Sequence, residues 1–313
     1  MNLSQITACL LTLVTAFAAF SSPLKLDNMK LNNNDALDGM YPTASDISSD
    51  GRYLFIVGYG KNSCEDKGDG VMVFDISKPN KINRVATYCG LYFKPSAEAL
   101  SLLSENPYQL LVSAEGWNNA KICEFNVSTK DLTCDDEIYI NDFKSGKKMQ
   151  ENSGIDIARK DQIPLKKGDL WVMPDSSDRL WIYDKDCYKN GECEAKFKLK
   201  LPKYLNQAED ICINTCPEDS SKQCTYIADI GSGGSDKLYT ISHEKLATLI
   251  ENKEQAEIKL KEWNEYNLRD LGKKIKDDSE SFSTIVFEGE VYAVISYKNK
   301  EGLIETFKIS QHK

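Results

Sequence analysis

Residues 209–241 read EDICINTCPEDSSKQCTYIADIGSGGSDKLYTI, and this stretch decides the fold because its pattern occurs five times in the chain. It begins with the tetrad Glu209-Asp210-Ile211-Cys212, continues with an apolar strand at residues 225–229 and ends in a further strand at residues 238–241. The copies start about 52, 58, 54 and 70 residues apart. Repetition on this scale predicts an array of similar units, none of which buries a core alone.

Each copy contains a tetrad of acidic or small residues followed by two or three more strands. The tetrads are Ser45-Asp46-Ile47-Ser48, Glu98-Ala99-Leu100-Ser101, Ile155-Asp156-Ile157-Ala158, Glu209-Asp210-Ile211-Cys212 and Glu280-Ser281-Phe282-Ser283. Second strands are expected at 53–59, 110–115, 170–175, 225–229 and 291–297, third strands at 71–76, 121–127, 180–184, 238–241 and 304–309, and fourth strands at 82–89, 132–140, 195–201 and 258–266. Four strands make one propeller blade. The sequence therefore predicts an all-β propeller of five blades, with six blades as the alternative.

The two ends of the chain and one long interval refine this prediction. Too few residues follow the fifth tetrad for four strands, whereas residues 24–31 alternate apolar and polar side chains. We expect this N-terminal segment to close the last blade as its outer strand, which leaves no open edge. In residues 242–259, Leu246, Leu249 and Ile250 have helical spacing, which predicts a small helical insertion in blade four.

The N-terminus resembles a targeting segment. Residues 6–20 form an uncharged apolar run that is short for a membrane span, with cleavage expected after Ala18 or Ser21. Cys9 inside this run leaves a lipoprotein anchor as an alternative. We expect residues 1–21 to be a signal peptide and residues 22–313 to be one propeller domain, secreted or, in a bacterium, periplasmic. No later stretch predicts a membrane span.

Charge and composition limit the classes of partner that the chain is expected to bind. The 313 residues carry a net charge of −9, which gives the chain no electrostatic reason to bind nucleic acid. Lys196, Lys198 and Lys200 alternate along one expected strand, which is typical of the outward face of a sheet edge. An extracellular protein or a carbohydrate remains as the expected partner, and the oligomeric state stays open.

Ten cysteines in a chain of this size favour an oxidising compartment. Apart from Cys9, local spacing favours four disulfides and leaves Cys212 as an unpaired thiol in a column of small buried residues. The expected pairs are Cys64–Cys89, Cys123–Cys134, Cys187–Cys193 and Cys216–Cys224. A zinc site on Cys212, Cys216 and Cys224 is the alternative, although the paired spacing of structural zinc sites is missing.

One stretch has a family resemblance. The segments Glu209-Asp210-Ile211, Tyr226-Ile227-Ala228-Asp229-Ile230-Gly231 and Lys237-Leu238-Tyr239-Thr240-Ile241 resemble a motif of secreted β-propellers that are loosely related to gluconolactonase-like and esterase-like propellers. Residues 70–79 are similar to the Leu-Val-Ile-Val-Asp propeller repeats. The resemblance implies a propeller fold. It implies no ligand role for the loop at Ser232-Gly233, where those proteins place Asp-Asn.

Acidic side chains gather on one predicted face, where the inner strands start and where the second strands turn into the third. Carboxylate oxygens are the ligands that Ca²⁺ prefers, so calcium is the expected cofactor if one binds. Capping of a neighbouring blade's backbone is the competing interpretation of these acids. Candidate ligand-binding residues are Glu98, Glu115, Trp117, Asn118, Asp156 and Asp210, and candidate metal ligands are Asp175, Asp229 and Glu280.

The sequence predicts no catalytic residue. Its histidines, His243 and His312, are not placed to serve a central nucleophile, and no phosphate-binding loop is present. Asn126-Val127-Ser128 is a glycosylation sequon if the chain follows a eukaryotic secretory route. We therefore expect a secreted binding or scaffold module with an acidic face. A cation-dependent lactonase or esterase, or a glycosidase with a pair of carboxylates, is the alternative.

Overall fold

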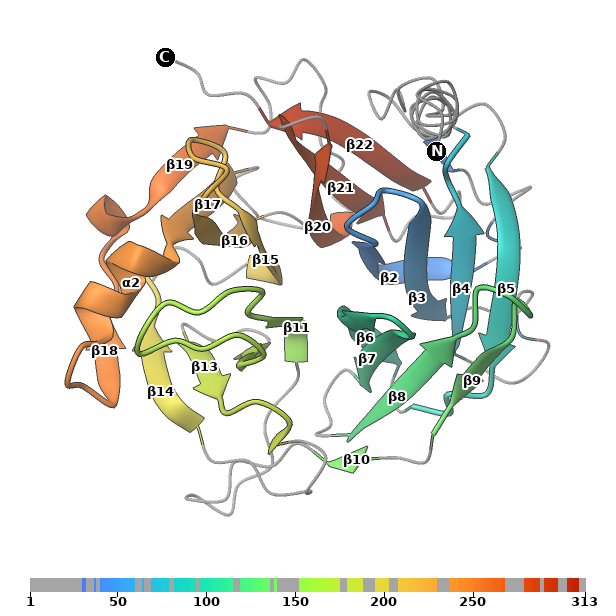
Figure 1. Ribbon diagram of the computed structural model, residues 1–313, viewed down its shortest axis with the longest axis horizontal. Helices are drawn as coiled ribbons and strands as arrows, with labels where there is room; N and C mark the ends of the chain where they lie inside the picture. The colour runs from blue at the N-terminus through green and yellow to red at the C-terminus, as the bar shows by residue number, and fades with distance from the viewer. Residues whose placement is uncertain are drawn as a thin grey trace, which may run out of the picture.

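Strands arranged radially around a centre are the main elements of the described part of the chain (Figure 1). The computed structural model describes residues 30–31, 37, 40–59, 64, 69–78, 82–93, 96–114, 119–135, 138–139, 152–174, 179–187, 195–202, 208–229, 237–267, 279–287, 290–297 and 303–309. In these residues the strands form five antiparallel sheets, one of which gains a parallel strand at its outer edge. The fold is an all-β propeller.

The sheets follow one another along the chain, and we number them in that order. Sheet one holds β2 (Tyr41–Ile47), β3 (Tyr53–Tyr59), β4 (Gly70–Asp75) and β5 (Asn83–Cys89). Sheet two holds β6 (Ala97–Glu105), β7 (Tyr108–Ala114), β8 (Asn119–Phe125), β9 (Leu132–Cys134) and β10 (Ile138–Tyr139). Sheet three holds β11 (Asn152–Ile157), β12 (Leu170–Pro174), β13 (Arg179–Tyr183), β14 (Ala195–Lys200) and β18 (Gln255–Glu257). Sheet four holds β15 (Ala208–Thr215), β16 (Gln223–Asp229), β17 (Lys237–Ser242) and β19 (Asn264–Asn267). Sheet five holds β20 (Ser279–Phe287), β21 (Glu290–Tyr297), β22 (Leu303–Ile309) and β1 (Lys30–Leu31).

The second strand of each sheet is apolar because both of its faces are covered. In β16 every residue from Gln223 to Asp229 is buried. In β3, Phe55 packs into a cluster shared with sheet two, whereas its neighbour Ile56 packs into a cluster shared with sheet five. Side chains alternate across a strand. A strand between two neighbouring sheets therefore needs apolar residues at consecutive positions.

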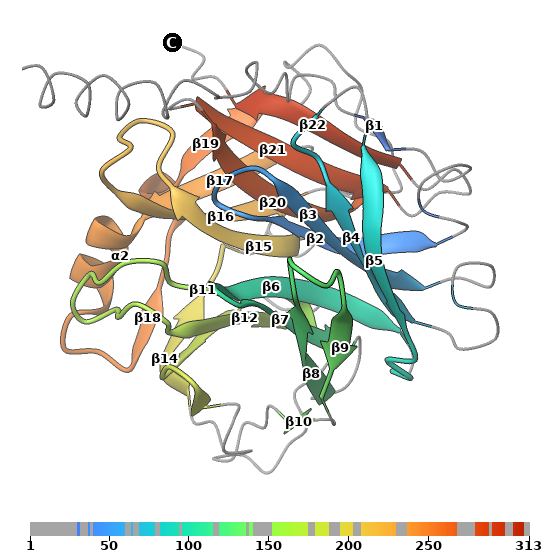
Figure 2. The ribbon, with the colours of Figure 1, turned by 45° about the vertical axis from the view of Figure 1, so that its right-hand side comes forward.

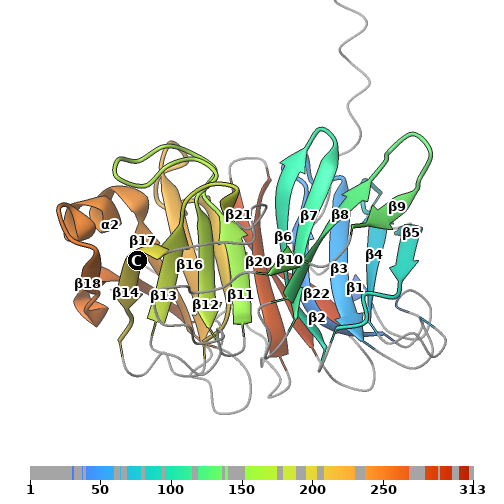
Figure 3. The same ribbon diagram turned by 90° about the horizontal axis from the view of Figure 1, so that it is seen from below.

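Apolar clusters between neighbouring sheets close the ring. Separate clusters join sheets one and two, two and three, three and four, four and five, and five and one. The inner strands contact one another in the same order, from β2 through β6, β11, β15 and β20 back to β2. Figure 2 shows β6, β11 and β15 side by side near the centre, and Figure 3 shows the sheets standing edge-on around it. Each sheet is thus buried on both faces by its neighbours.

The N-terminal segment closes sheet five, as the alternating pattern predicted. Lys30 pairs with Glu305 and Leu31 with Ile304, both antiparallel to β22. The rest of the predicted strand, residues 24–29, lies outside the described residues. The expected outer strand of the last sheet is therefore supplied from the other end of the chain.

The long fourth interval holds the predicted helical insertion. Helix α2 (His243–Ile250) starts directly after β17, and the Ser242 side chain accepts a hydrogen bond from the Lys245 N–H at its N-terminus. The chain then returns to sheet three, where β18 pairs in parallel with β14. The prediction that Lys196, Lys198 and Lys200 mark a bare sheet edge is therefore wrong, because β18 covers β14. No helix among the described residues is long and apolar enough to cross a membrane.

Disulfides join Cys64 to Cys89, Cys123 to Cys134 and Cys216 to Cys224, as predicted. Cys187 is also disulfide-bonded, and Cys193, its predicted partner, lies outside the described residues. Cys212 is a buried free thiol. The zinc alternative is excluded because Cys216 and Cys224 bind each other.

Removal of β1 should weaken the closure of the ring. A truncated chain that begins at Asn32 should melt several degrees below one that begins at Asn28, because only the longer chain retains the pairing of Lys30 and Leu31 with β22. Thermal unfolding followed by circular dichroism measures this difference. Equal melting temperatures would contradict the proposed role of β1.

Candidate functional site

Two cavities among the described residues lie on the face where the inner strands end. The larger has a volume of about 390 Å³, and the smaller a volume of about 260 Å³. Glu105 and Arg159 line both of them. Because residues from all five sheets line the two cavities, the site is made by the ring of sheets and not by one loop.

Buried aspartates on the inner strands sit beneath the cavities. Asp46, Asp156 and Asp210 each use Oδ1 to accept the N–H of the following residue, at 2.7 Å in every case. Each uses Oδ2 to accept an N–H from the inner strand of another sheet. These cross-sheet donors are Leu102 at 2.8 Å from Asp46, Ile213 at 2.5 Å from Asp156 and Phe282 at 3.1 Å from Asp210. Both oxygens of each carboxylate therefore tie sheets together.

Arg159 spans the space between two of these aspartates. Its Nη2 lies 3.1 Å from Asp156 Oδ1 and 3.5 Å from Asp46 Oδ2, and its Nη1 donates to the Leu102 carbonyl oxygen at 2.5 Å. The Arg159 side chain is 33% exposed, whereas those of Asp46 and Asp156 are 11% and 5% exposed. The guanidinium group thus neutralises buried carboxylates on one side and lines the cavities on the other.

Burial changes the titration of these groups. Burial raises the pKa of Asp46 to about 6, against the opposing effects of Arg159 and two backbone N–H groups. Burial also raises the pKa of Asp210 well above its ordinary value. The pKa of Arg159 is raised because the attraction of Asp156 and Asp46 outweighs its own burial. The dominant electrostatic feature of the site is a permanent cation, Arg159, next to Asp46, whose pKa is raised by burial.

A buried histidine network holds the backbone at Arg159. The Arg159 N–H donates to Gln223 Oε1 at 2.5 Å, and Gln223 Nε2 lies 2.7 Å from His243 Nδ1. His243 stacks on Trp171 at a centroid distance of 4.7 Å and contacts Thr225 Oγ1 at 2.8 Å. Burial lowers the pKa of His243 to about 3, so the ring is neutral near pH 7. Its hydrogen bonds to Gln223 and Thr225 and its stacking on Trp171 tie together β12, β16 and the start of α2.

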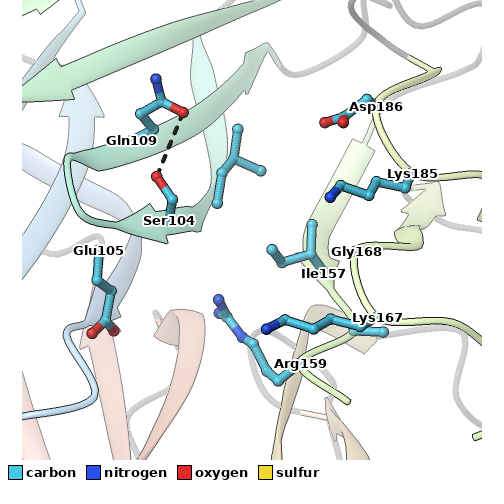
Figure 4. Close-up of a pocket in the computed structure, with 11 residues that line it drawn as sticks. Ser104, Glu105, Gln109, Ile157, Arg159, Lys167, Gly168, Lys185 and Asp186 are labelled. Carbon is cyan, nitrogen blue, oxygen red and sulfur yellow. Dashed lines mark hydrogen bonds between the residues drawn. The ribbon is translucent and has the colours of Figure 1, made fainter. Parts of the chain in front are cut away.

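The larger cavity has a mixed polar and basic lining (Figure 4). Glu105 accepts from the Ser49 N–H and Oγ–H, both at 2.6 Å. Ser104 Oγ lies 3.5 Å from Gln109 Oε1. Lys167 and Lys185 complete the basic side of the cavity. Such a surface can exchange hydrogen bonds with a small polar molecule.

The residues predicted from sequence divide into three groups. Asp156 and Asp210 lie together at the centre with Asp46, and all three hydrogen-bond across sheets. Glu98 in β6 is half-buried, Asp229 at the end of β16 is buried, and Glu280 lies in β20, with its side chain outside the described part. The remaining candidates, Glu115, Trp117, Asn118 and Asp175, lie outside the described residues. The predicted face therefore stays a prediction for the candidates at the other end of the sheets, whereas Asp156 lies near the end of β11, on the side of the cavities, and not at the start of its inner strand.

Metal ligands and the sequon complete this comparison. Within the described part of the chain, no group of three or more His, Cys, Asp or Glu side chains could hold a metal ion. Asn126 is exposed in the turn between β8 and β9, where its Oδ1 accepts from the Ser128 N–H at 2.9 Å. Glycosylation of Asn126 stays a prediction.

Sequence reasoning missed the basic residues of the cavity. Arg159 follows the third tetrad directly, three residues after Asp156. This spacing of a cation and an aspartate was the one pattern that could have predicted their ion pair. Lys167 and Lys185 lie in two separate loops of sheet three. Only the folded sheet brings them to one cavity.

Stability should fall as the pH rises from about 4 to about 7. Burial raises the pKa of Asp69 to about 7 and that of Asp46 to about 6, so the folded state holds protons that the unfolded state releases near 3.8. Each unit of raised pKa corresponds to about 1.4 kcal/mol of stability that is present at low pH and lost as the pH passes through the folded-state value. Urea unfolding at a series of pH values measures this slope.

Asp69→Asn should flatten the slope between pH 5 and 7 because asparagine does not titrate. Asp131→Asn, at an exposed position in the turn before β9, is the matched control and should leave the slope unchanged. A slope that is the same in all three proteins would contradict the assignment to Asp69.

The comparisons with known proteins support the fold. No protein-family model matches the chain, and no curated protein matches it. An exo-β-1,3-galactanase from Phanerochaete chrysosporium superposes with a TM-score of 0.52 at 9% identity, over 85% of this chain and 60% of that one. A GH43 β-1,3-galactosidase superposes with a TM-score of 0.51 at 9% identity, over 93% and 60%. A periplasmic gluconolactonase from Pseudomonas aeruginosa gives a TM-score of 0.43 at 9% identity, over 82% and 68%.

The chain therefore spans about three fifths of the length of the two glycosidases that it matches. Identity at this level shows a common fold and nothing about activity. The resemblance of residues 209–241 to named propeller motifs receives no family name from these matches. What the structure and the comparisons establish together is a disulfide-bonded β-propeller.

Proposed function

We propose that this chain is an exported, five-bladed β-propeller that acts as a binding module for a saccharide. The proposed ligand site is the pair of cavities beside Arg159. The observation that carries the proposal is that the central carboxylates are engaged in holding the sheets together, while the neighbouring cavities offer polar side chains to a ligand.

Each of the five sheets is taken as one blade. A sixth blade would have to separate two sheets that already share an apolar cluster and contacting inner strands. Export is consistent with the disulfides, which persist in oxidising compartments.

The hydrogen bonds of the central acids support binding without catalysis. A glycosidase needs one carboxyl group that can protonate a leaving group and another that faces the sugar or a water molecule. Asp46, Asp156 and Asp210 instead accept backbone N–H groups with both oxygens, and Glu105 accepts two bonds from Ser49. Use of these acids in hydrolysis would require the loss of bonds between sheets.

A saccharide is the ligand class that fits the lining. Gln109, Ser104 and the charged side chains supply donors and acceptors around a volume at the low end of small-molecule sites. The galactanase that shares the fold has been observed with β-1,3-galactotriose and with galactose, which makes galactosides the first ligands to test. The enzymatic alternative, a lactonase, esterase or glycosidase, predicts conversion of the ligand in the same assay.

A glycan array followed by calorimetry on the best ligand tests this function. Gln109→Leu should lower the affinity at least tenfold because it removes an amide from the cavity, and Gln255→Leu on β18, outside the cavity, is the matched control. Nuclear magnetic resonance after prolonged incubation should find the ligand intact. Cleavage of the ligand, or binding that is indifferent to Gln109→Leu, would contradict the proposal.

The same titration decides whether calcium takes part. The calcium prediction concerns Asp175, Asp229 and Glu280, and the cavity beside Arg159 needs no cation. Affinity should therefore be equal in millimolar Ca²⁺ and in EDTA. A gain in affinity with Ca²⁺ that Asp229→Asn removes would move the site to the face predicted from sequence.

A further inference from the structure

The larger cavity is lined by cationic side chains, although the protein as a whole is acidic. Arg159, Lys167 and Lys185 all line it, although the chain carries a net charge of −9. Figure 4 shows the nitrogen ends of the three side chains directed toward a common space, with Glu105 on the other side. Like charges in one recess repel unless a counter-charge is present.

Among the described residues, the acids of the cavity wall form no ion pair with its two lysines. Both Glu105 oxygens accept hydrogen bonds from Ser49. Arg159 is paired with Asp156 and Asp46 behind the wall. Asp186 is the remaining acid in the lining, and Figure 4 shows it on the same side of the space as Lys185. Among the described residues, neither Lys167 nor Lys185 forms an ion pair.

The local backbone directs one of these lysines into the cavity. Gly168 has a φ of +88°, a conformation that side chains rarely adopt. A Cβ at this position would lie 2.8 Å from Lys185 Cδ and 2.9 Å from its Cγ. The stem of Lys185 therefore packs across Gly168, and a larger residue would displace it. This contact holds an ammonium group beside the cavity without an acidic partner.

We propose that this cavity binds the acidic group of its ligand, so that the preferred saccharide carries a carboxylate. Lys167 and Lys185 contact the carboxylate, and Arg159, which is held in place by Asp156, adds positive potential at the inner end. Ser104 and Gln109 are left for hydroxyl groups. Cations that line a recess with low-dielectric walls concentrate anions there. This inference rests on the proposed function and names the class of saccharide.

Calorimetric titrations of the full chain with D-glucuronate, D-glucose and inorganic phosphate test the inference. Glucuronate should bind at least tenfold more tightly than glucose, because only glucuronate supplies the counter-charge. The double variant Lys167→Gln/Lys185→Gln should lower the affinity for glucuronate to that for glucose. The matched control is Lys166→Gln/Lys253→Gln, which removes the same charge at exposed positions outside the cavity and should bind like the wild type.

The outcomes separate this inference from the proposed function. Equal affinities for glucose and glucuronate, or a double variant that binds like the control, would overturn the acidic ligand and leave saccharide binding in place. Phosphate that binds while glucuronate does not would assign the cavity to a free anion and overturn the saccharide. Failure of both sugars to bind would overturn the acidic ligand, whereas the proposed function would be overturned by a glycan array in which no saccharide binds. Melting temperatures of both double variants should match the wild type, since the substituted side chains are exposed.

Discussion

The ring depends on hydrogen bonds that cross from one inner strand to the next. An inner strand is the edge of its sheet, so some of its backbone N–H groups lack a partner strand. Those groups are buried here, and a buried donor without an acceptor costs about 1–3 kcal/mol. Asp46, Asp156 and Asp210 supply the acceptors, and each one reaches a neighbouring sheet. The same side chains therefore accept hydrogen bonds from N–H groups at the inner edges of the sheets and link each sheet to its neighbour.

The use of aspartates as acceptors brings negative charge into the core. This charge requires a cation, and that cation lines the cavities. Carboxylates as buried as Asp46 and Asp156 need a nearby cation. Arg159 provides it, and its position is fixed by the Leu102 carbonyl oxygen and by a network that ends at His243. One third of the guanidinium side chain remains exposed to the cavities. The scaffold and the proposed ligand site are thus coupled through a single side chain.

The sequence predicted the fold more completely than the site. The repeated tetrads and apolar strands predicted the strand order, because burial on both faces leaves a continuous apolar pattern. The alternation at residues 24–31 predicted β1, and the helical spacing within residues 242–259 predicted a helical insertion, which the structure places at His243–Ile250. Cysteine spacing predicted three disulfides that are present. Capping was one of two interpretations of Asp156 and Asp210, and spacing alone could not choose between them. No sequence pattern predicts that Lys167 and Lys185 line one cavity, because they lie in two separate loops that only the folded sheet three brings together. The pairing of β18 with β14 requires the chain to return from sheet four to sheet three, and no local sequence pattern predicts this return.

The stability of Asp156→Ala tests the central claim most directly. Asp156 accepts from the Ile157 N–H, the Ile213 N–H and the Ser101 Oγ–H, and it pairs with Arg159. Urea unfolding at pH 7 should show a loss of about 2 kcal/mol or more, because its removal leaves buried donors without an acceptor. Asp131→Ala at an exposed turn should change stability by about 0.5 kcal/mol or less. Equal stabilities of the two variants would contradict the account, because the sheets would then be held together without the aspartates.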